Sequence, residues 1–292
     1  MAIFEGAGTA IVTPFKNGKI DFDALGKLLE WQVAEGIDAI IITGTTGEAS
    51  TQTDDEQIEA IKFAVDTVAK RIPVIAGVGS NDTKHGIHLS QRAEKAGVDG
   101  LLHVTPYYNK TSKPGLIKHF TMIAESVSAP IILYSVPGRT GLNITPEIVA
   151  EVAKVPNIVA IKEATGNISQ VVEIARISPP GFDMYSGNDD MIIPLMSVGG
   201  IGVISVLSNI LPKETHEMAD KYLKGDIKGA AALQLKYKKL IDLLFCEVNP
   251  IPVKAALYMM GKIEYEYRMP LCQMEEGNYA KLKAEMEVQG LI

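Results

Sequence analysis

Residues 38–48 read DAIIITGTTGE, and this stretch decides the fold. Its first half is a continuous apolar run without in–out alternation, which is typical of a strand buried on both faces. Its second half is a polar turn flanked by glycines. A capping-box pattern follows at residues 53–56, and apolar residues then repeat at helical spacing, at Ile58, Ile61, Val65 and Val68. The stretch therefore predicts one strand–loop–helix unit of a parallel sheet.

Seven further apolar runs extend this pattern along the chain. They lie at residues 8–13, 73–78, 100–105, 130–134, 158–162, 183–186 and 202–206, with amphipathic segments between them. Eight successive units favour an α/β fold that closes as a (β/α)8 TIM barrel, and an open, doubly wound sheet is the alternative. The barrel accounts for residues 1–224. Residues 225–292 read as a C-terminal helical region, treated as an appendage because no Gly/Ser-rich linker precedes it.

Composition excludes several classes of protein. Hydrophobic residues make up 47% of the 292 residues and charged residues 22%, which argues against intrinsic disorder. The 28 Lys and Arg residues against 35 Asp and Glu give a net charge of −7 without a basic cluster, so we expect no nucleic-acid partner. No apolar stretch approaches the roughly 18 to 20 residues of a membrane span, and we expect no signal or transit peptide. With only two cysteines, we expect a cytoplasmic location.

Polar residues at the ends of the predicted strands are the candidates for chemistry, because barrel enzymes carry their active sites at the C-terminal ends of the strands. Thr45 and Thr46 offer hydroxyls and backbone N–H groups to a small anion such as a carboxylate. Taken alone, they are better explained as caps of the following helix. Tyr107 and Tyr108, after the fourth strand, fit a catalytic role and a packing role about equally well.

Two cations stand out at later strand ends. Arg139 follows Tyr134 on a glycine-flanked turn, where a guanidinium suits a carboxylate or phosphate better than a surface ion pair. Lys162 ends the sixth apolar run, and Glu163 is poorly placed to pair with it because adjacent strand residues point to opposite faces. If Lys162 is neutral near pH 7, its pKa falls by roughly three units from about 10.4, which desolvation can cause. A neutral buried amine is a nucleophile toward carbonyl carbons and suits Schiff-base chemistry with a keto acid.

Six motifs carry a resemblance to a known family. They occupy residues 8–15, 44–48, 105–109, 134–141, 161–166 and 249–254, in order along almost the whole chain. With them the sequence resembles the class I, pyruvate-dependent lyases and synthases, and most of all the dihydrodipicolinate synthase family. The resemblance implies 4-hydroxy-tetrahydrodipicolinate synthase activity, which condenses pyruvate with L-aspartate 4-semialdehyde on the diaminopimelate route to lysine. It also implies a lyase that needs no metal or organic cofactor beyond the covalent pyruvate adduct.

The resemblance implies catalytic roles for four residues. Lys162 forms the Schiff base with pyruvate, and Tyr134, Thr45 and Tyr108 form a proton relay to solvent. In this family the tyrosine that matches Tyr108 reaches across a subunit interface. A homo-oligomer is therefore expected, either a dimer or a homotetramer built as a dimer of dimers.

Four further residues are expected to bind substrate. Thr46 holds the pyruvate carboxylate through its hydroxyl and backbone N–H, Arg139 binds the carboxylate of the second substrate, and Gly187 and Ile204 turn backbone carbonyls toward the site. Arg139 disfavours the first alternative, an N-acetylneuraminate lyase or a 2-keto-3-deoxy sugar acid aldolase of the same family. A catalytically silent keto-acid sensor is the second alternative. It predicts the loss of Lys162 or of a tyrosine, and none is lost.

The same resemblance predicts weak or absent feedback by lysine. Members that lysine inhibits tend to carry histidines and a glutamate at the positions that hold Asp54, Gln57 and His85 here, although Asn81 and Tyr107 are retained. Without that glutamate, the ammonium of the inhibitor lacks its natural partner.

Two remaining patterns are better explained without a metal. His85 and His88 have i, i+3 spacing, but no acidic ligand follows at a suitable distance, so a solvated helix face is expected. Asp189 and Asp190 follow a strand, as an Asx cap does. We therefore expect no metal site.

Overall fold

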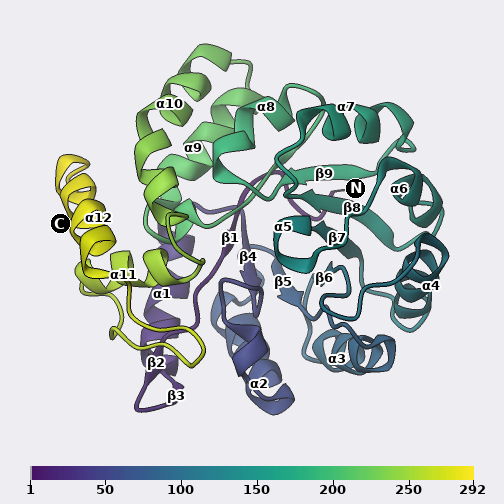
Figure 1. Ribbon diagram of the computed structural model, residues 1–292, viewed down its shortest axis with the longest axis horizontal. Coiled ribbons are helices and arrows are strands. Elements are labelled where there is room, and N and C mark those ends of the chain that lie inside the picture. Colours follow the sequence, from purple (N-terminus) through teal and green to yellow (C-terminus); the bar gives the residue numbers. More distant parts are fainter. Residues whose placement is uncertain (1) are drawn as a thin grey trace.

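Eight parallel strands close into a barrel in the computed structural model, which describes residues 2–292. The order around the barrel is β1-β10-β9-β8-β7-β6-β5-β4, and β4 pairs with β1 to close it. Figure 1 shows the strands with helices around them. This confirms the predicted (β/α)8 barrel and excludes the open sheet. The barrel strands are β1 Gly6–Ala10, β4 Ala39–Ile42, β5 Val74–Gly77, β6 Gly100–Val104, β7 Ile131–Ser135, β8 Ile158–Glu163, β9 Asp183–Ser186 and β10 Gly202–Ser205.

Helices connect the strands and cover the outside of the barrel. The capping box predicted at the start of α2 is present, because Thr53 and Glu56 exchange side-chain and backbone hydrogen bonds. Pro146 begins α6, as expected for its fixed φ angle. The helices of the barrel are α1 Phe22–Ala34, α2 Asp54–Val68, α3 Thr83–Lys95, α4 Lys113–Ala124, α5 Pro137–Thr140, α6 Pro146–Val152, α7 Ile168–Ile177, α8 Ile192–Met196 and α9 Pro212–Leu223.

Both faces of the strands are buried, which explains the continuous apolar runs. In β4, Ile41 belongs to a hydrophobic cluster inside the barrel, whereas Ile40 and Ile42 belong to a larger cluster between strands and helices. Phe4 completes the inner cluster, with its ring stacked on Tyr185 at a centroid distance of 4.4 Å. Because alternate residues enter two different cores, the in–out polarity of an ordinary strand is missing from the sequence.

The first strand differs from the prediction, since it spans Gly6–Ala10 instead of residues 8–13. Beyond Ala10 the chain stays buried but takes some of its hydrogen bonds from outside the strand ladder. The N–H of Val12 donates to the side chain of Asn209, and the hydroxyl of Thr13 donates to the backbone oxygen of Gly47. An apolar run in the sequence indicates burial but does not distinguish this arrangement from a strand. The predicted strand therefore ends later than the observed one.

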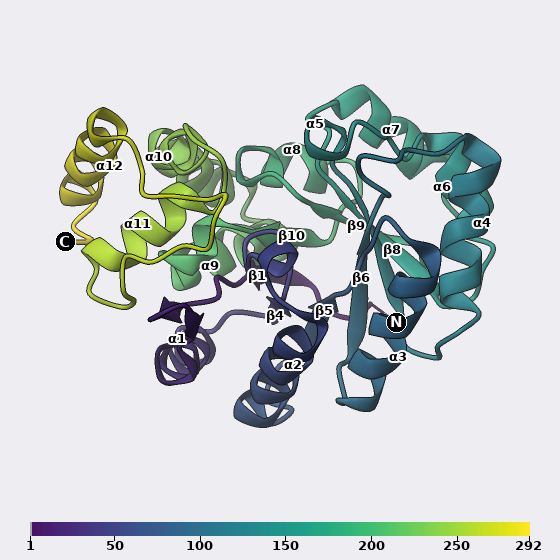
Figure 2. The same cartoon turned by 60° about the horizontal axis from the view of Figure 1, so that its bottom comes forward.

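The C-terminal part of the chain forms α10 (Ile227–Leu244), α11 (Ile251–Met259) and α12 (Glu276–Val288). In Figures 1 and 2 these helices lie together on one side of the barrel. The segment that follows α11 contacts α1, where the Nζ of Lys262 lies 3.5 Å from the ring centroid of Trp31. The segment after α11 also holds the hairpin of β2 (Phe15–Lys16) and β3 (Lys19–Ile20), because Glu266 accepts from the N–H groups of Asn17 and Gly18. The division at residue 224 stays a proposal.

No helix among residues 2–292 is long and apolar enough to cross a membrane.

Candidate active site

Lys162 lies inside the barrel, near the C-terminal end of β8. Its backbone is in register with Tyr134 on β7 and Tyr185 on β9, two members of the inner cluster. The residue is 6% exposed, and its Nζ lies 4.3 Å from the centroid of the Tyr134 ring. Glu163 points to the opposite face, where the hydroxyl of Thr165 donates to its carboxylate. Glu163 therefore does not neutralise Lys162, as the strand alternation predicts.

Burial lowers the pKa of the Lys162 amine to about 7. The carboxylate of Asp189 acts in the opposite direction, and the positive charge of Arg139 lowers the pKa further. Desolvation is the largest cause, because an ammonium loses most of its water inside the barrel. At neutral pH a large share of Lys162 is consequently the free amine, which is the nucleophilic form.

The rate at which Lys162 captures a 2-keto acid is expected to rise with pH through this pKa. The neutral fraction of an amine with a pKa of about 7 grows from about one in eleven at pH 6 to about ten in eleven at pH 8, so the rate rises roughly tenfold. Borohydride quenching at short times, followed by intact-mass measurement, gives this rate. A rate that stays flat between these pH values contradicts the lowered pKa.

A cavity of about 400 Å³ opens beside Tyr134. Thr45, Tyr134 and Arg139 line it, together with residues from the loops that follow β4, β5 and β6. Burial raises the pKa of the Tyr134 phenol, while the charge of Arg139 and the side chain of Thr45 act in the opposite direction. The phenol therefore keeps its proton near neutral pH. Tyr134 lines the cavity, and its ring lies between that cavity and the amine of Lys162, which is not itself among the lining residues.

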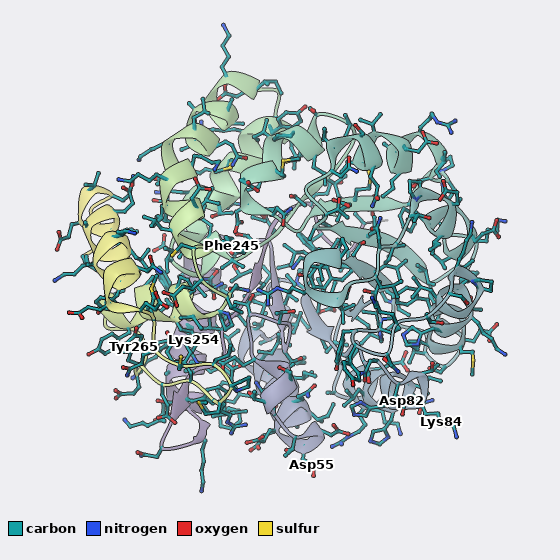
Figure 3. The ribbon with its side chains drawn as sticks, viewed as in Figure 1. Asp55, Asp82, Lys84, Phe245, Lys254 and Tyr265 are labelled. Atoms are coloured by element: carbon teal, nitrogen blue, oxygen red, sulfur yellow. The ribbon has the colours of Figure 1, made fainter. Side chains whose placement is uncertain are left out.

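The loop after β4 is held by residues from a distant part of the chain. Thr43 and Glu48 have positive φ angles of 54° and 55°, so the loop turns tightly at both ends. The Oγ1 of Thr46 accepts a 3.0 Å hydrogen bond from Nδ2 of Asn249. Glu48 forms a buried ion pair with Lys254, with Nζ and Oε1 2.5 Å apart. Figure 3 labels Lys254, on the side of the barrel that α11 occupies. The C-terminal helices thus fix the loop that carries Thr45 and Thr46.

Arg139 stands in α5, the short helix after β7, and lines the same cavity. Its Nη2 donates to the backbone oxygen of Asn249 at 3.0 Å. Because this partner is a carbonyl and not a carboxylate, the guanidinium charge stays available to an anion that enters the cavity.

Gly187 and Ile204 belong to the ends of β9 and β10. A Cβ at Gly187 would lie 3.1 Å from the Cε of Lys162 and 2.6 Å from the Cβ of Ala164, so a side chain here would displace the lysine. Ile204 is buried in the inner cluster. Both residues lie in the part of the barrel that holds Lys162, and the role of their carbonyls stays a prediction.

Contrary to the prediction from the sequence, Asp189 does not cap the helical turn that follows it but binds a neighbouring turn. Its Oδ2 accepts from the backbone N–H groups of Val206 and Leu207, at 3.0 and 2.9 Å, because the turn after β10 leaves these groups free. The residue is 2% exposed, and its Oδ1 has no hydrogen-bond partner among residues 2–292. Its charge raises the pKa of Lys162. The sequence offered only an acidic residue after a strand end, which did not reveal this position.

Tyr108 does not line the cavity of its own chain. It is 92% exposed with a φ angle of 66°, in the loop between β6 and α4, whereas Tyr107 is 40% exposed and lines the cavity. A single chain therefore brings Lys162, Tyr134 and Thr45 together without Tyr108.

Comparison with known proteins places this arrangement in a family. The chain matches the Dihydrodipicolinate synthetase family over residues 3–289. The chain belongs to this family. A 4-hydroxy-tetrahydrodipicolinate synthase of Caldicellulosiruptor bescii is 56% identical over 292 residues, which cover 100% of this chain and 99% of the relative. Dihydrodipicolinate synthase from Thermotoga maritima has a crystal structure with a TM-score of 0.98 at 42% identity, and each chain is covered to 100%. The enzyme from Cyanidioschyzon merolae with lysine bound has a TM-score of 0.97 at 39% identity, again with 100% of each chain covered.

These comparisons confirm three predictions from the sequence, namely the family, the barrel fold and the lyase class. The geometry adds residues that the sequence did not single out for a role in the site. Asn249 and Lys254 lie within one of the six family motifs, but they are separated from their partners by 203 and 206 residues. No local pattern relates residues at such separations.

Proposed function

We propose that this chain condenses pyruvate with L-aspartate 4-semialdehyde and so acts as a 4-hydroxy-tetrahydrodipicolinate synthase, like the relatives that carry this name. The observation that carries the proposal is Lys162, a buried amine with a pKa of about 7 beside the phenol of Tyr134. A lysine in this state supplies a Schiff base at neutral pH. No metal or organic cofactor is required, because the protonated imine on Lys162 withdraws electrons from the substrate.

In the first half of the reaction the free Nζ of Lys162 attacks the carbonyl carbon of pyruvate. Two proton transfers allow the former carbonyl oxygen to leave as water, and an imine remains. Loss of a proton from the methyl carbon then gives an enamine. Tyr134, whose ring centroid lies 4.3 Å from the Nζ of Lys162, moves these protons, and Thr45 continues the path to the cavity. Thr46 holds the carboxylate of pyruvate through its hydroxyl and backbone N–H.

In the second half the enamine carbon attacks the aldehyde carbon of the second substrate and forms a carbon–carbon bond. The aldehyde oxygen takes a proton and becomes a hydroxyl. The amine of the same substrate then attacks the imine carbon, which closes the ring and releases the amine of Lys162. Arg139 binds the carboxylate of this substrate, since it lines the cavity and its guanidinium has no carboxylate contact among residues 2–292.

The function is tested by adding pyruvate and borohydride to the protein and measuring its intact mass, followed by steady-state assays with two substrates. An adduct of one reduced pyruvate per chain and turnover of L-aspartate 4-semialdehyde are expected. Turnover of N-acetylneuraminate or of a 2-keto-3-deoxy sugar acid in its place would favour the alternative within the family. If the protein formed no adduct, the keto-acid sensor would be the only one of the three hypotheses that remains.

We further propose that Tyr108 completes the proton relay of a second copy of the chain. Its exposure of 92% and its absence from the cavity of its own chain support this role. The active assembly is then at least a dimer, and we propose a homotetramer built from two such dimers. Both cysteines, Cys246 and Cys272, are free, which supports a reducing compartment such as the cytoplasm.

Mixing two inactive variants is expected to restore activity if Tyr108 acts across an interface. In a hybrid dimer of Tyr108→Phe and Lys162→Ala subunits, one site receives an intact Lys162 from the first subunit and an intact Tyr108 from the second. After exchange of subunits, the steady-state assay with pyruvate and L-aspartate 4-semialdehyde should recover about a quarter of the activity of the unaltered protein. Half of the dimers are then hybrids, and each hybrid has one intact site out of two. No recovery, despite hybrids seen by native mass spectrometry, would contradict a shared site.

Lysine is expected to inhibit this enzyme weakly or not at all. Asp54, Gln57 and His85 line the cavity, but they already bind one another and the backbone. The Nε2 of His85 lies 2.9 Å from the Oδ1 of Asp54, and Gln57 donates to the backbone oxygen of Ala49. An ammonium ligand would have to share the Asp54 carboxylate with His85. A low-micromolar inhibition constant in the coupled assay would contradict this prediction.

A further inference from the structure

We propose that Asn249 is a positioning residue that sets the donor direction of the Thr46 hydroxyl, and that it thereby prepares this hydroxyl for the carboxylate of the keto acid. The inference rests on the proposed function, in which Thr46 binds that carboxylate. Asn249 lies between α10 and α11 and is 5% exposed, and Thr46 is 3% exposed. Their contact is therefore shielded from bulk water.

The direction of the hydrogen bond between these side chains decides what Thr46 offers to a substrate. A threonine hydroxyl has one hydrogen to donate and two lone pairs that accept. Since Nδ2 of Asn249 donates to Oγ1 of Thr46 at 3.0 Å, this contact occupies a lone pair and leaves the hydroxyl hydrogen free. A carboxylate accepts hydrogen bonds and donates none, so the free hydrogen is what an anionic substrate needs.

The surroundings hold the backbone of Asn249 and the loop of Thr46 in place. Its backbone oxygen accepts from Nη2 of Arg139 at 3.0 Å, and Lys254 of the adjoining helix pairs with Glu48 on the loop of Thr46. The Oδ1 of Asn249 has no hydrogen-bond partner among the residues described. A buried amide oxygen without a partner lowers stability, and most proteins avoid it. This unpaired oxygen points to a function of the side chain other than stabilising the fold.

One residue thus contacts both groups that are proposed to bind substrate carboxylates. The side chain of Asn249 reaches Thr46, which serves the keto acid, and its backbone oxygen reaches Arg139, which serves the second substrate. Substitution of the Asn249 side chain removes or reverses the first contact and keeps the second, which the backbone makes. A variant at this position therefore reports mainly on the keto-acid subsite.

The test compares two variants that differ in what they do to the Thr46 hydroxyl. In Asn249→Asp the new carboxylate accepts the hydroxyl hydrogen, so this hydrogen is lost to the substrate. In Asn249→Ala the hydrogen stays free. The KM for pyruvate is expected to rise about 10- to 100-fold in Asn249→Asp, and at most about 3-fold in Asn249→Ala, with a smaller change in kcat in both.

Asn167→Asp is the matched control. Asn167 is exposed and caps α7 through its Oδ1, and an aspartate caps a helix equally well, so the control adds the same charge without touching Thr46. Its KM for pyruvate should equal that of the unaltered protein.

A double-mutant cycle with Thr46 adds a second readout. In the Thr46→Val background, Asn249→Asp should raise KM less than about twofold, because the hydroxyl through which it acts is gone.

The outcomes separate this inference from the proposed function. Equal KM values for Asn249→Asp and Asn249→Ala, or an additive cycle, overturn the role of Asn249 while borohydride trapping in the unaltered protein still supports the function. No adduct in the unaltered protein overturns the function itself. Should Asn249→Asp fail to fold, Asn249→Ala still decides: the hydroxyl has then lost its fixed direction, so the KM for pyruvate is expected to rise about 2- to 3-fold, and an unchanged KM overturns the inference.

Discussion

Replacing Lys162 with methionine is expected to abolish turnover and, at the same time, to stabilise the fold. Without the amine no Schiff base forms, and kcat/KM should fall by about 10⁴-fold or more, as when other enzymes lose their nucleophile. In the unaltered protein the unfolded chain carries a lysine with a pKa near 10.5, while burial lowers the pKa of the folded amine to about 7. This difference opposes folding at pH 7 by up to about 4 kcal/mol, which the methionine variant avoids.

The pH dependence of this stabilisation follows from the direction of the shift. Between pH 7 and pH 10.5 the unfolded state binds the proton and the folded state does not, so the unaltered protein gains stability as the pH rises. The advantage of Lys162→Met over the unaltered protein should therefore be constant below pH 7 and shrink by about 1.4 kcal/mol per pH unit above it. Chemical denaturation at pH 6, 7, 8 and 9 measures this trend.

Lys162→Arg is the control for this experiment. Arginine keeps its charge at every accessible pH, so this variant should be inactive like Lys162→Met but without a gain in stability. A methionine variant that is no more stable than the unaltered protein would show that the amine is well solvated and that its pKa is not lowered.

Local sequence patterns were sufficient to predict the barrel and the buried amine of Lys162 with its lowered pKa. Runs such as Ile40–Ile42 mark strands buried on both faces, and parallel strands with helices between them have few ways to close. Lys162 stood out because a charged residue in such a run requires an explanation. The outward direction of Glu163 followed from strand alternation and is seen in the structure.

The parts that escaped prediction depend on contacts between distant segments. Asn249 reaches Thr46 across 203 residues, and Asp189 binds the turn after β10 instead of capping its own helix. Such contacts leave no trace in periodicity, because they depend on how complete elements pack and not on which element a residue joins. The absence of a linker predicted that the C-terminal helices are an appendage, but nothing local indicated that residues between α10 and α12 hold the loop that carries Thr45 and Thr46.

Replacing Lys254 with methionine is expected to destabilise the protein by about 3 to 5 kcal/mol, because Glu48 is then left as a buried charge without its partner. The side chains of Glu48 and Lys254 are 0% and 1% exposed, and their charged atoms lie 2.5 Å apart. The backbone N–H of Arg268 also donates to Glu48, but it cannot balance a full charge. Because Glu48 ends the loop of Thr45 and Thr46, kcat/KM should fall as well. Thermal and denaturant unfolding measure the first effect, and the coupled assay measures the second.

A solvent-exposed ion pair with the same distance between its charged atoms is the control for this experiment. It separates the effect of burial from the effect of pairing. Lys62 and Asp66 also lie 2.5 Å apart, but their side chains are 65% and 62% exposed. Lys62→Met should change the free energy of unfolding by less than about 1 kcal/mol, since water screens and solvates the remaining carboxylate. In the double variant Glu48→Gln/Lys254→Met the buried charge is gone, so part of the lost stability should return. If Lys254→Met proved no more damaging than Lys62→Met, the ion pair would not hold the loop, and the C-terminal helices would act on the site through Asn249 alone.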